Sequence, residues 1–403
     1  MKVSLTPQRL TLAIAVCITC MVCLTRLSMA AGQVFNGLAL LFGLILLYKE
    51  RKYLSFPEGT KGYCVAYGIF VLSTLPAALF SGDISKGMHE FLQMWIWRYV
   101  VFLLILFCIR RRDYLVNMLT VFTAVFGFDC FLTLIQVLFH LGNNDRGWGL
   151  GGSQLGIASL MCIMMPLVFV VLFDSAFEKR LKKVSAFTLI CICIGLICNK
   201  SRGSWLSNIL LVPFASWRYI IHNKKFLGIV IGLFIAFGAF FASQPQYTAR
   251  FESITNTTTD RSNGDRIEGW KACIDMYMDH PVAGIGLGQW RNYYPSYRYA
   301  TEIQGLNHAH NNFFHLLTET GTIGMAGLLY FVGYFVITSF RRWRKDKNPY
   351  DLLILTTMLG YICIFGQIEY TMDLSSGVRI FWFILAILMQ MKALSLNTTK
   401  ADT

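Results

Sequence analysis

Apolar runs of about 16–25 residues recur along the whole chain, and short polar connectors separate them. A helix needs about 20 such residues to cross the hydrocarbon core of a membrane. The period-2 alternation of a membrane β-barrel is absent. The pattern therefore predicts an all-α polytopic membrane protein with about 12 transmembrane helices, at residues 10–24, 33–48, 62–80, 91–109, 114–139, 153–173, 184–198, 204–221, 226–242, 316–340, 352–367 and 377–393.

The first apolar run could also be a signal peptide. Lys2 and Arg9 precede it, and the small residues at 28–30 would suit a cleavage site. Because many further runs follow, we favour an uncleaved first span.

Composition and charge agree with the membrane interpretation. Only 14% of the 403 residues are charged, too few to cover a soluble protein of this length. The net charge of +14 would suggest nucleic-acid binding in a soluble protein. Here more than half of the 36 Lys and Arg residues lie in alternate connectors and at the two ends. By the positive-inside rule this predicts that both termini are cytoplasmic, and it argues against a nucleic-acid partner.

The same topology divides the chain into three regions. Residues 1–242 would form spans one to nine, and residues 243–315 would form one long loop domain on the outer, periplasm-like face. Residues 316–403 would form the last three spans and a short cytoplasmic tail.

The long loop carries the signals of a helix. Asp265 followed by Glu268 is typical of a capping box, and Pro281 would end the helix. Apolar residues recur at helical spacing, which predicts an apolar face made of Ile267, Trp270, Ile274 and Tyr277. The glycines at 284, 286 and 288 favour a sharp turn over a dinucleotide-binding motif, because no βαβ unit surrounds them.

The twelve cysteines do not suggest a disulfide framework, because nearly all lie inside apolar runs, where cysteine acts as a small hydrophobic residue. Cys17, Cys20 and Cys23 share one helix stripe without a nearby His or carboxylate, so helix packing is favoured over a metal site.

Three of the seven histidines lie at the junction of the loop and the next span: His308, His310 and His315. Titratable groups are costly at a membrane boundary and suggest a function. His310 is the best candidate for a general base, with His308 and His315 as competitors and a structural role open for each. His308 and His310 could instead ligate a metal, but their sequence neighbours supply no complete ligand set.

Two arginines are candidate anion-binding residues. Arg202 lies in a very tight turn at the outer end of a span, where it could bind a phosphate or only anchor the helix end. Arg266 is expected in the first turn of the loop helix, beside free backbone N–H groups that favour an anion. An ordinary solvated Arg266, or one paired with Asp265, is the alternative.

Three motifs together resemble the O-antigen ligase/polymerase superfamily of bacterial inner-membrane proteins. They are an arginine turn at 201–205 (SRGSW), a loop-helix motif at 266–286, and a His-Asn motif at 308–324 that leads into the next span. Their order and the single long outer loop before span ten also fit. The resemblance implies a GT-C-like multi-pass protein of the bacterial inner membrane.

The resemblance further implies transfer of a glycan from undecaprenyl pyrophosphate to a sugar hydroxyl of lipid A–core oligosaccharide, in lipopolysaccharide biosynthesis. His310 would take the proton of the hydroxyl, and Arg202 and Arg266 would stabilise the pyrophosphate as the glycosidic bond breaks. Transfer would invert the anomeric centre and need no metal or other cofactor. We further expect the substrates to contact His308, Asn311, Lys200, Trp270, Arg146 and Arg291. The aromatic stretch 290–299 could contact sugars or form a lid packed on the bilayer.

Other functions remain open. An O-antigen polymerase would use similar chemistry, but such proteins commonly show two sizeable outer loops. A protein O-oligosaccharyltransferase would usually carry a longer C-terminal portion. A transporter would place charges near mid-membrane; here Asp129 and Arg98 are the main intramembrane charges, and the other candidates gather at the outer face. These comparisons favour the ligase.

Overall fold

A computed structural model describes residues 6–141, 145–222, 227–228, 231–232, 235, 238–239, 242–256, 260–299 and 305–401. These residues form helices and the turns between them, and none lies in a strand, which confirms an all-helical membrane protein. Ten helices are long and apolar enough to cross a membrane: α1 (Pro7–Leu24), α2 (Met29–Lys49), α3 (Lys61–Leu79), the continuous α4–α5 (Ile84–Cys108), α6 (Arg112–Leu138), α7 (Gln154–Phe173), α8 (Lys179–Asn199), α14 (Asn312–Asp346), α15 with its extension (Pro349–Gln367) and α16 (Ser375–Ala401).

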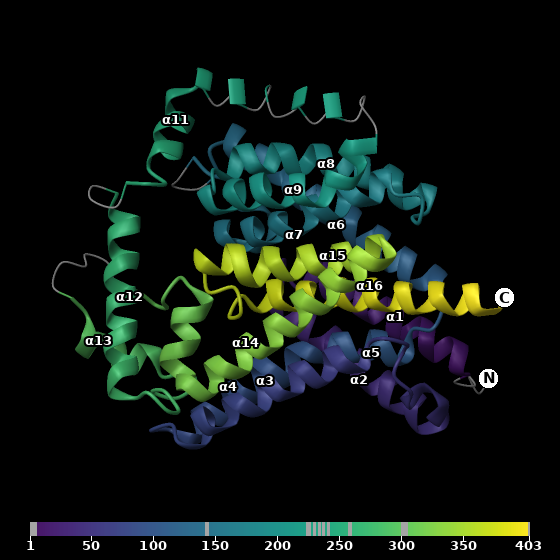
Figure 1. The fold of residues 1–403 in the computed structure, drawn as a ribbon, viewed down its shortest axis with the longest axis horizontal. Helices are drawn as coiled ribbons and strands as arrows, with labels where there is room; N and C mark the ends of the chain where they lie inside the picture. The colour runs from purple at the N-terminus through teal and green to yellow at the C-terminus, as the bar shows by residue number, and fades with distance from the viewer. Residues whose placement is uncertain are drawn as a thin grey trace.

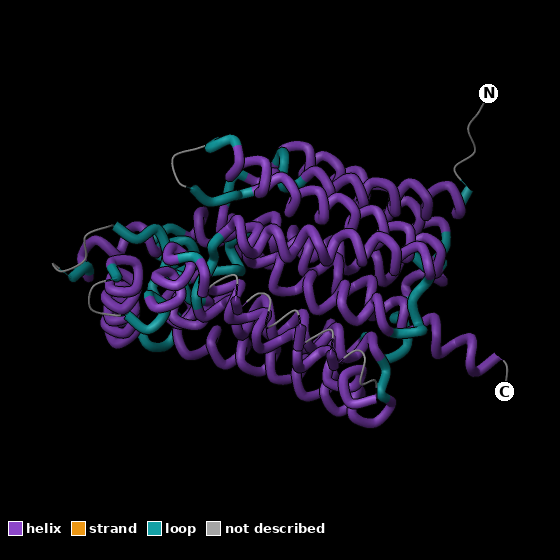
Figure 2. Tube along the Cα trace, turned by 90° about the horizontal axis from the view of Figure 1, so that it is seen from above, coloured by secondary structure: helices purple, strands orange, loops and turns teal. Residues whose placement is uncertain are grey.

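The long helices lie side by side, and both termini lie at the same end of the bundle (Figures 1 and 2). At the opposite end, α12 (Arg261–Asp279) runs across the ends of the long helices, with α13 (Trp290–Tyr297) beside it and α11 (Pro245–Glu252) close to its start (Figure 1). We call this the α12 end. The arrangement separates a bundle from a small helical cap.

Two further spans were expected. Helix α9 (Arg202–His222) matches the span predicted at 204–221 and packs beside α7, but it is more polar than the ten helices above. Most of the span predicted at 226–242 lies outside the described residues. The count of twelve therefore stays a prediction.

Helix α16 lies at the centre of the bundle, with 89% of its most apolar window buried. Its Trp382 meets the ring of Tyr99 at 4.7 Å and that of Tyr67 at 4.7 Å. Where helices approach most closely, small residues allow it: a side chain at Gly327 of α14 would collide with Ser73 of α3. Such contacts matter in a membrane because lipid removes the hydrophobic drive for helix association.

Two boundaries differ from the sequence prediction because polar residues cap helices earlier than expected. The connector predicted at 81–90 contains α4 (Ile84–Phe91), whose N-cap Asp83 accepts a hydrogen bond from the Lys86 amide. The helix of the last long connector, α12, begins at Arg261 and not at Asp265, because Asp260 is its N-cap and accepts from the Asn263 amide at 3.0 Å. The capping-box prediction was wrong, and Arg266 lies in the second turn of the helix.

The predicted apolar face of α12 was also displaced. The buried face is made of Asp265, Gly269, Ala272, Cys273 and Met276. Ile274, expected on that face, is 46% exposed. Pro281 follows the end of the helix as predicted.

Helix α14 is broken at Gly321, whose backbone has φ +61° and ψ −162°. A side chain there would collide with the carbonyl of Val282, so glycine is required. The break exposes carbonyls of the first segment, and the glycine-rich turn after α12 uses them: Ile285 N–H donates to Thr318 and Gly286 N–H to Glu319, at 3.0 and 3.1 Å. The predicted sharp turn at 284–288 is confirmed, and it fixes the cap to the bundle.

Candidate functional site

A cavity of about 260 Å³ opens at the α12 end, between the cap and the ends of the long helices. We call it the arginine cavity. Its wall combines residues from six separate parts of the chain: Arg146, Gln154, Leu155, Ser201, Arg202, Gly203, Arg250, Ser262, Asp265, Arg266, Leu306, His310 and Ile368. The three residues proposed as catalytic, His310, Arg202 and Arg266, thus share one cavity, although 108 positions of chain separate the first from the second (310 − 202).

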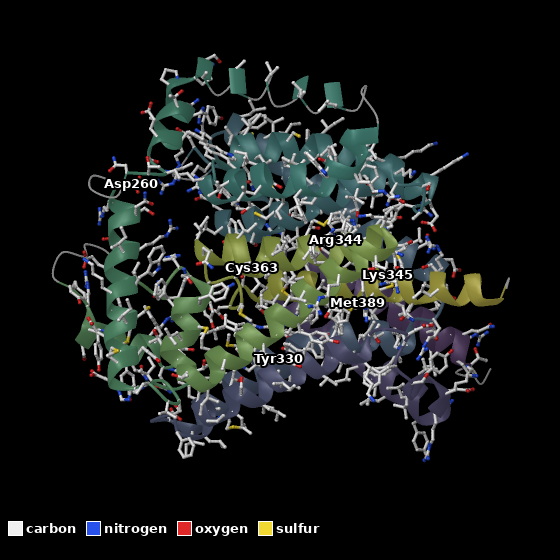
Figure 3. All side chains as sticks on the ribbon, in the orientation of Figure 1. Asp260, Tyr330, Arg344, Lys345, Cys363 and Met389 are labelled. Atoms are coloured by element: carbon white, nitrogen blue, oxygen red, sulfur yellow. The ribbon has the colours of Figure 1, made fainter. Side chains whose placement is uncertain are left out.

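Arg202 is the first residue of α9, directly after the turn that ends α8. Its guanidinium donates to the Asp260 carboxylate at 3.1 and 3.4 Å and to the Ser253 carbonyl at 2.7 Å. Asp260 is labelled in Figure 3, at the start of α12. The anionic partner expected for Arg202 is therefore, in this structure, a carboxylate of the protein, and the ion pair ties the bundle to the cap.

Arg146 reaches the cavity from a glycine-rich loop. Its Nε–H donates to the Asn199 carbonyl at 2.8 Å. Asp129, inside α6, holds the same loop by accepting from the Leu150 amide at 2.6 Å, and Arg26, in the turn between α1 and α2, pairs with Asp129. The intramembrane charge of Asp129 thus positions a loop of the site.

The cavity has a strongly positive wall. Burial, followed by the charges of the neighbouring arginines, lowers the pKa of Arg146 to about 10, so this side chain stays protonated at neutral pH. Burial also lowers the pKa of Arg266 and of Arg250. Arg266 has no hydrogen-bond acceptor in range among the residues the structure describes. Uncompensated guanidinium groups in a concave site favour an anionic ligand such as a phosphate.

The carboxylate of Glu369 contacts both His308 and His310. Glu369, in the turn between α15 and α16, is 1% exposed and lies 2.5 Å from His308 Nε2 and 2.9 Å from His310 Nδ1. Burial alone would raise the pKa of Glu369, but the hydrogen bonds and charges of the two histidines outweigh it and lower the pKa below its usual range. Glu369 is therefore ionised and can only accept hydrogen bonds.

This arrangement determines the proton positions on His310. Because Glu369 accepts, His310 Nδ1 must carry the proton, and Nε2 keeps its lone pair. Burial lowers the pKa of His310 and outweighs the opposing effect of Glu369, so the neutral ring is favoured. A neutral imidazole whose other nitrogen is fixed by a carboxylate can act as a general base. The backbone of His310 is left-handed, with φ +48°, a conformation that non-glycine residues adopt only when their surroundings impose it.

The same three residues could offer metal ligands, since their ligand atoms lie within 4.8 Å of one another. The sequence argument against a metal, that the neighbours of His308 and His310 supply no complete ligand set, did not foresee Glu369, which approaches from a distant turn. The geometry nevertheless fits direct hydrogen bonds better. Two ligands on a tetrahedral zinc, with bonds of about 2.1 Å, would be about 3.4 Å apart, whereas the two contacts here are 2.5 and 2.9 Å.

The other predicted contact residues lie around the cavity without lining it. Asn311 caps α14 by accepting from the amides of Phe313 and Phe314. Lys200 reaches Gln246, and Arg291 is exposed on α13. Trp270 donates through its indole N–H to the Ala309 carbonyl at 2.8 Å. His308 does not line the cavity, but its ring lies 4.2 Å from that of His310 and it shares the carboxylate of Glu369 with that residue.

Sequence reasoning missed two residues. Glu369 lies in the connector between the last two predicted spans and was given no role, and Arg250 was not considered. Arg250 of α11 lines the cavity and donates to the Lys200 carbonyl at 3.3 Å. Its only sequence signal was a basic residue within the long outer segment.

Comparison with known families agrees with this geometry. Residues 187–329 match the family model described as O-antigen ligase, a stretch that carries Arg202, Arg250, Arg266 and His310. This partial match supports membership of the O-antigen ligase/polymerase superfamily. Members of this superfamily are glycosyltransferase-like enzymes that act as ligases or polymerases. No curated protein matches the chain.

Proposed function

We propose that this superfamily member is an O-antigen ligase of the bacterial inner membrane. It would transfer the O-polysaccharide from undecaprenyl pyrophosphate to the lipid A–core oligosaccharide. The observation that carries the proposal is that a neutral, carboxylate-bound histidine and four arginines line one cavity at the α12 end. The α12 end would face the periplasm, and both termini the cytoplasm.

In the proposed reaction, the acceptor hydroxyl oxygen attacks the anomeric carbon of the donor. His310 Nε2 takes the hydroxyl proton, and the bond from the anomeric carbon to the phosphate oxygen breaks. The electron pair of that bond goes to the leaving undecaprenyl pyrophosphate. Attack opposite to the leaving group inverts the anomeric centre. The positive charge that forms on His310 is stabilised by Glu369, which is 2.9 Å from Nδ1.

The arginines would bind the pyrophosphate and stabilise the charge that grows on it. Arg266 and Arg250 are the most available. Among the residues that the structure describes, Arg266 has no acceptor and Arg250 donates only through its Nε–H to a backbone carbonyl. Arg202 shares its guanidinium with Asp260, so its direct contact with the donor would have to compete with that carboxylate. Its positive charge acts on the cavity in either case. Arginines at these positions would take the place of a divalent metal, and we propose a metal-independent reaction.

Complementation of a ligase-deficient strain tests this proposal, read as lipopolysaccharide ladders on a gel. The wild-type chain should restore the ladder, and His310→Ala and Arg266→Ala should not, although both insert into the membrane. Arg291→Ala is the matched control, because Arg291 is exposed and outside the cavity. If the histidine variant restores the full ladder, the proposed mechanism is wrong. If the wild-type chain instead rescues a strain that lacks its O-antigen polymerase, the polymerase assignment is correct.

A further inference from the structure

The short segment His308-Ala309-His310 is held through the backbone of its middle residue. Ala309 is fully buried, in a small core between α12, α13 and the start of α14. Its carbonyl accepts the indole N–H of Trp270 at 2.8 Å, and its N–H donates to Nδ1 of His315 at 3.4 Å. Both backbone polar groups of one residue are thus bound by side chains. We call this pair of contacts the Ala309 clamp.

His315 is itself fixed in one tautomer. Because Nδ1 accepts the Ala309 N–H, the ring proton must be on Nε2, which faces Glu319 Oε1 at 3.5 Å. Glu319 is 2% exposed and also accepts the Trp290 amide at 3.1 Å. The ring of His315 packs at 3.8 Å from that of Tyr370, the residue after Glu369. The His315 ring, which binds the Ala309 N–H, is therefore held between two buried side chains, Glu319 and Tyr370.

Trp270 is equally constrained. Its ring stacks on Phe314 at 5.5 Å, nearly parallel, and its only hydrogen-bonding atom is used by Ala309. Because one ring face is covered by Phe314 and the N–H is bound, this indole is better placed to hold the Ala309 backbone than to stack on a sugar.

The Ala309 clamp fixes the orientation of the two histidines that flank Ala309. His308 and His310 flank Ala309, and both must reach the same carboxylate of Glu369. His310 does so with a left-handed backbone that would relax if it were not held. A small rotation of the Ala309 peptide units would move both rings away from Glu369, and misplacement of a catalytic group by about 1 Å can cost about 100-fold in rate.

We propose that Trp270 and His315 are positioning residues that fix Ala309 and so hold His310 in its reactive orientation. The inference rests on the proposed function of His310 as the general base. It reassigns Trp270 from substrate binding and removes His315 from the candidates for the base.

Three substitutions at His315 separate the two contacts of its ring. The Oδ1 atom of asparagine can take the place of Nδ1, so His315→Asn keeps an acceptor for the Ala309 N–H. His315→Gln places its amide near Nε2 and Glu319 but leaves Ala309 without an acceptor, and His315→Leu removes both contacts. In glycan transfer by the purified full-length protein, we expect kcat to be highest for His315→Asn. For His315→Gln and His315→Leu we expect kcat to be about 10- to 100-fold below that of the wild type. KM for the lipid-linked donor should be unchanged in all three, because none of these side chains lines the cavity.

Trp270→Phe provides the second measurement. It keeps the stack on Phe314 but removes the indole N–H, so kcat should fall with an unchanged donor KM. Tyr219→Phe is the matched control, because that hydroxyl donates to Asp174 at the end of α7 away from the cavity. A raised KM with unchanged kcat for Trp270→Phe would overturn the inference and favour substrate binding. Equal kcat for the asparagine and leucine variants of His315 would also overturn it.

A double-mutant comparison excludes a general loss of folding. If Trp270 and His315 act only through the histidine segment, Trp270→Phe should cause no further loss in a His310→Ala background. A full additional loss there would contradict the inference but leave the proposed function intact. A His310→Ala protein with wild-type kcat would contradict the proposed function itself.

Discussion

Replacement of Glu369 by glutamine removes the charge that the two histidines share and keeps a side chain of the same shape. The charged carboxylate and His310 are 2.9 Å apart between their nearest atoms, so their charge centres are about 4 Å apart when the ring is protonated. At an effective dielectric constant of about 20, this attraction is worth about 4 kcal/mol, or about 1,000-fold in rate. The His310 side chain is 21% exposed, so solvent screens part of it. We expect kcat to fall by about 100- to 1,000-fold.

The pH dependence of the variant follows from the same contact. In the wild type, Glu369 raises the pKa of His310, while burial lowers it by more. Loss of the negative charge removes the raising contribution, so the pKa of His310 must fall further. The neutral base is present above its pKa, so the acid limb of the kcat profile should move to lower pH in Glu369→Gln.

Initial rates of glycan transfer by purified protein, measured across about pH 5 to 8 at saturating donor and acceptor, test both effects. Glu268→Gln is the matched control, because in the described part of the chain Glu268 pairs only with Lys271 on the same helix. A kcat within about twofold of the wild type would refute the role of Glu369. An acid limb that moves to higher pH would refute the sign of the argument.

Three further predictions concern the cavity and its support. Arg250→Ala should raise the KM for the donor by about tenfold, since a charge-assisted hydrogen bond is worth about 1.5–3 kcal/mol. Arg291→Ala should leave the KM unchanged, and equal KM values for the two variants would remove Arg250 from the site. Asp260→Ala should destabilise the protein by about 1–2 kcal/mol, because α12 loses its N-cap and Arg202 loses its partner; an unchanged thermal midpoint would contradict this. Transfer should continue in excess EDTA, whereas a loss of activity that zinc restores would assign His308, His310 and Glu369 to a metal site.

The sequence was sufficient to predict the bundle and to choose the main cavity residues. Apolar run length is a direct consequence of membrane thickness, so the ten long helices were predictable, most of their ends to within a few residues. Arg202 and His310 each lie beside the outer end of a predicted span. The charge pattern placed them on one face without any knowledge of their contacts.

Contacts between distant segments were not predictable. Glu369 meets His310 across 59 positions, in a short turn with no periodic pattern. Asp265 has the local pattern of a capping box, but Asp260 is the residue that pairs with Arg202. This pair stabilises Asp260 at the helix start, so α12 begins about one turn before the position that the sequence predicts. Trp270 was expected to contact the substrates, and nothing in its sequence neighbourhood reveals that its N–H is used by Ala309.

The central claim is that His310 transfers the acceptor proton while the donor loses undecaprenyl pyrophosphate. Its most direct test is a reconstituted reaction in proteoliposomes that counts glycan joined to lipid A–core and undecaprenyl pyrophosphate released. The wild type should give one of each per turnover, and His310→Ala should lower kcat by about 100- to 10,000-fold with an unchanged KM for the donor. Wild-type rates from His310→Ala, or transfer without release of undecaprenyl pyrophosphate, would contradict the account.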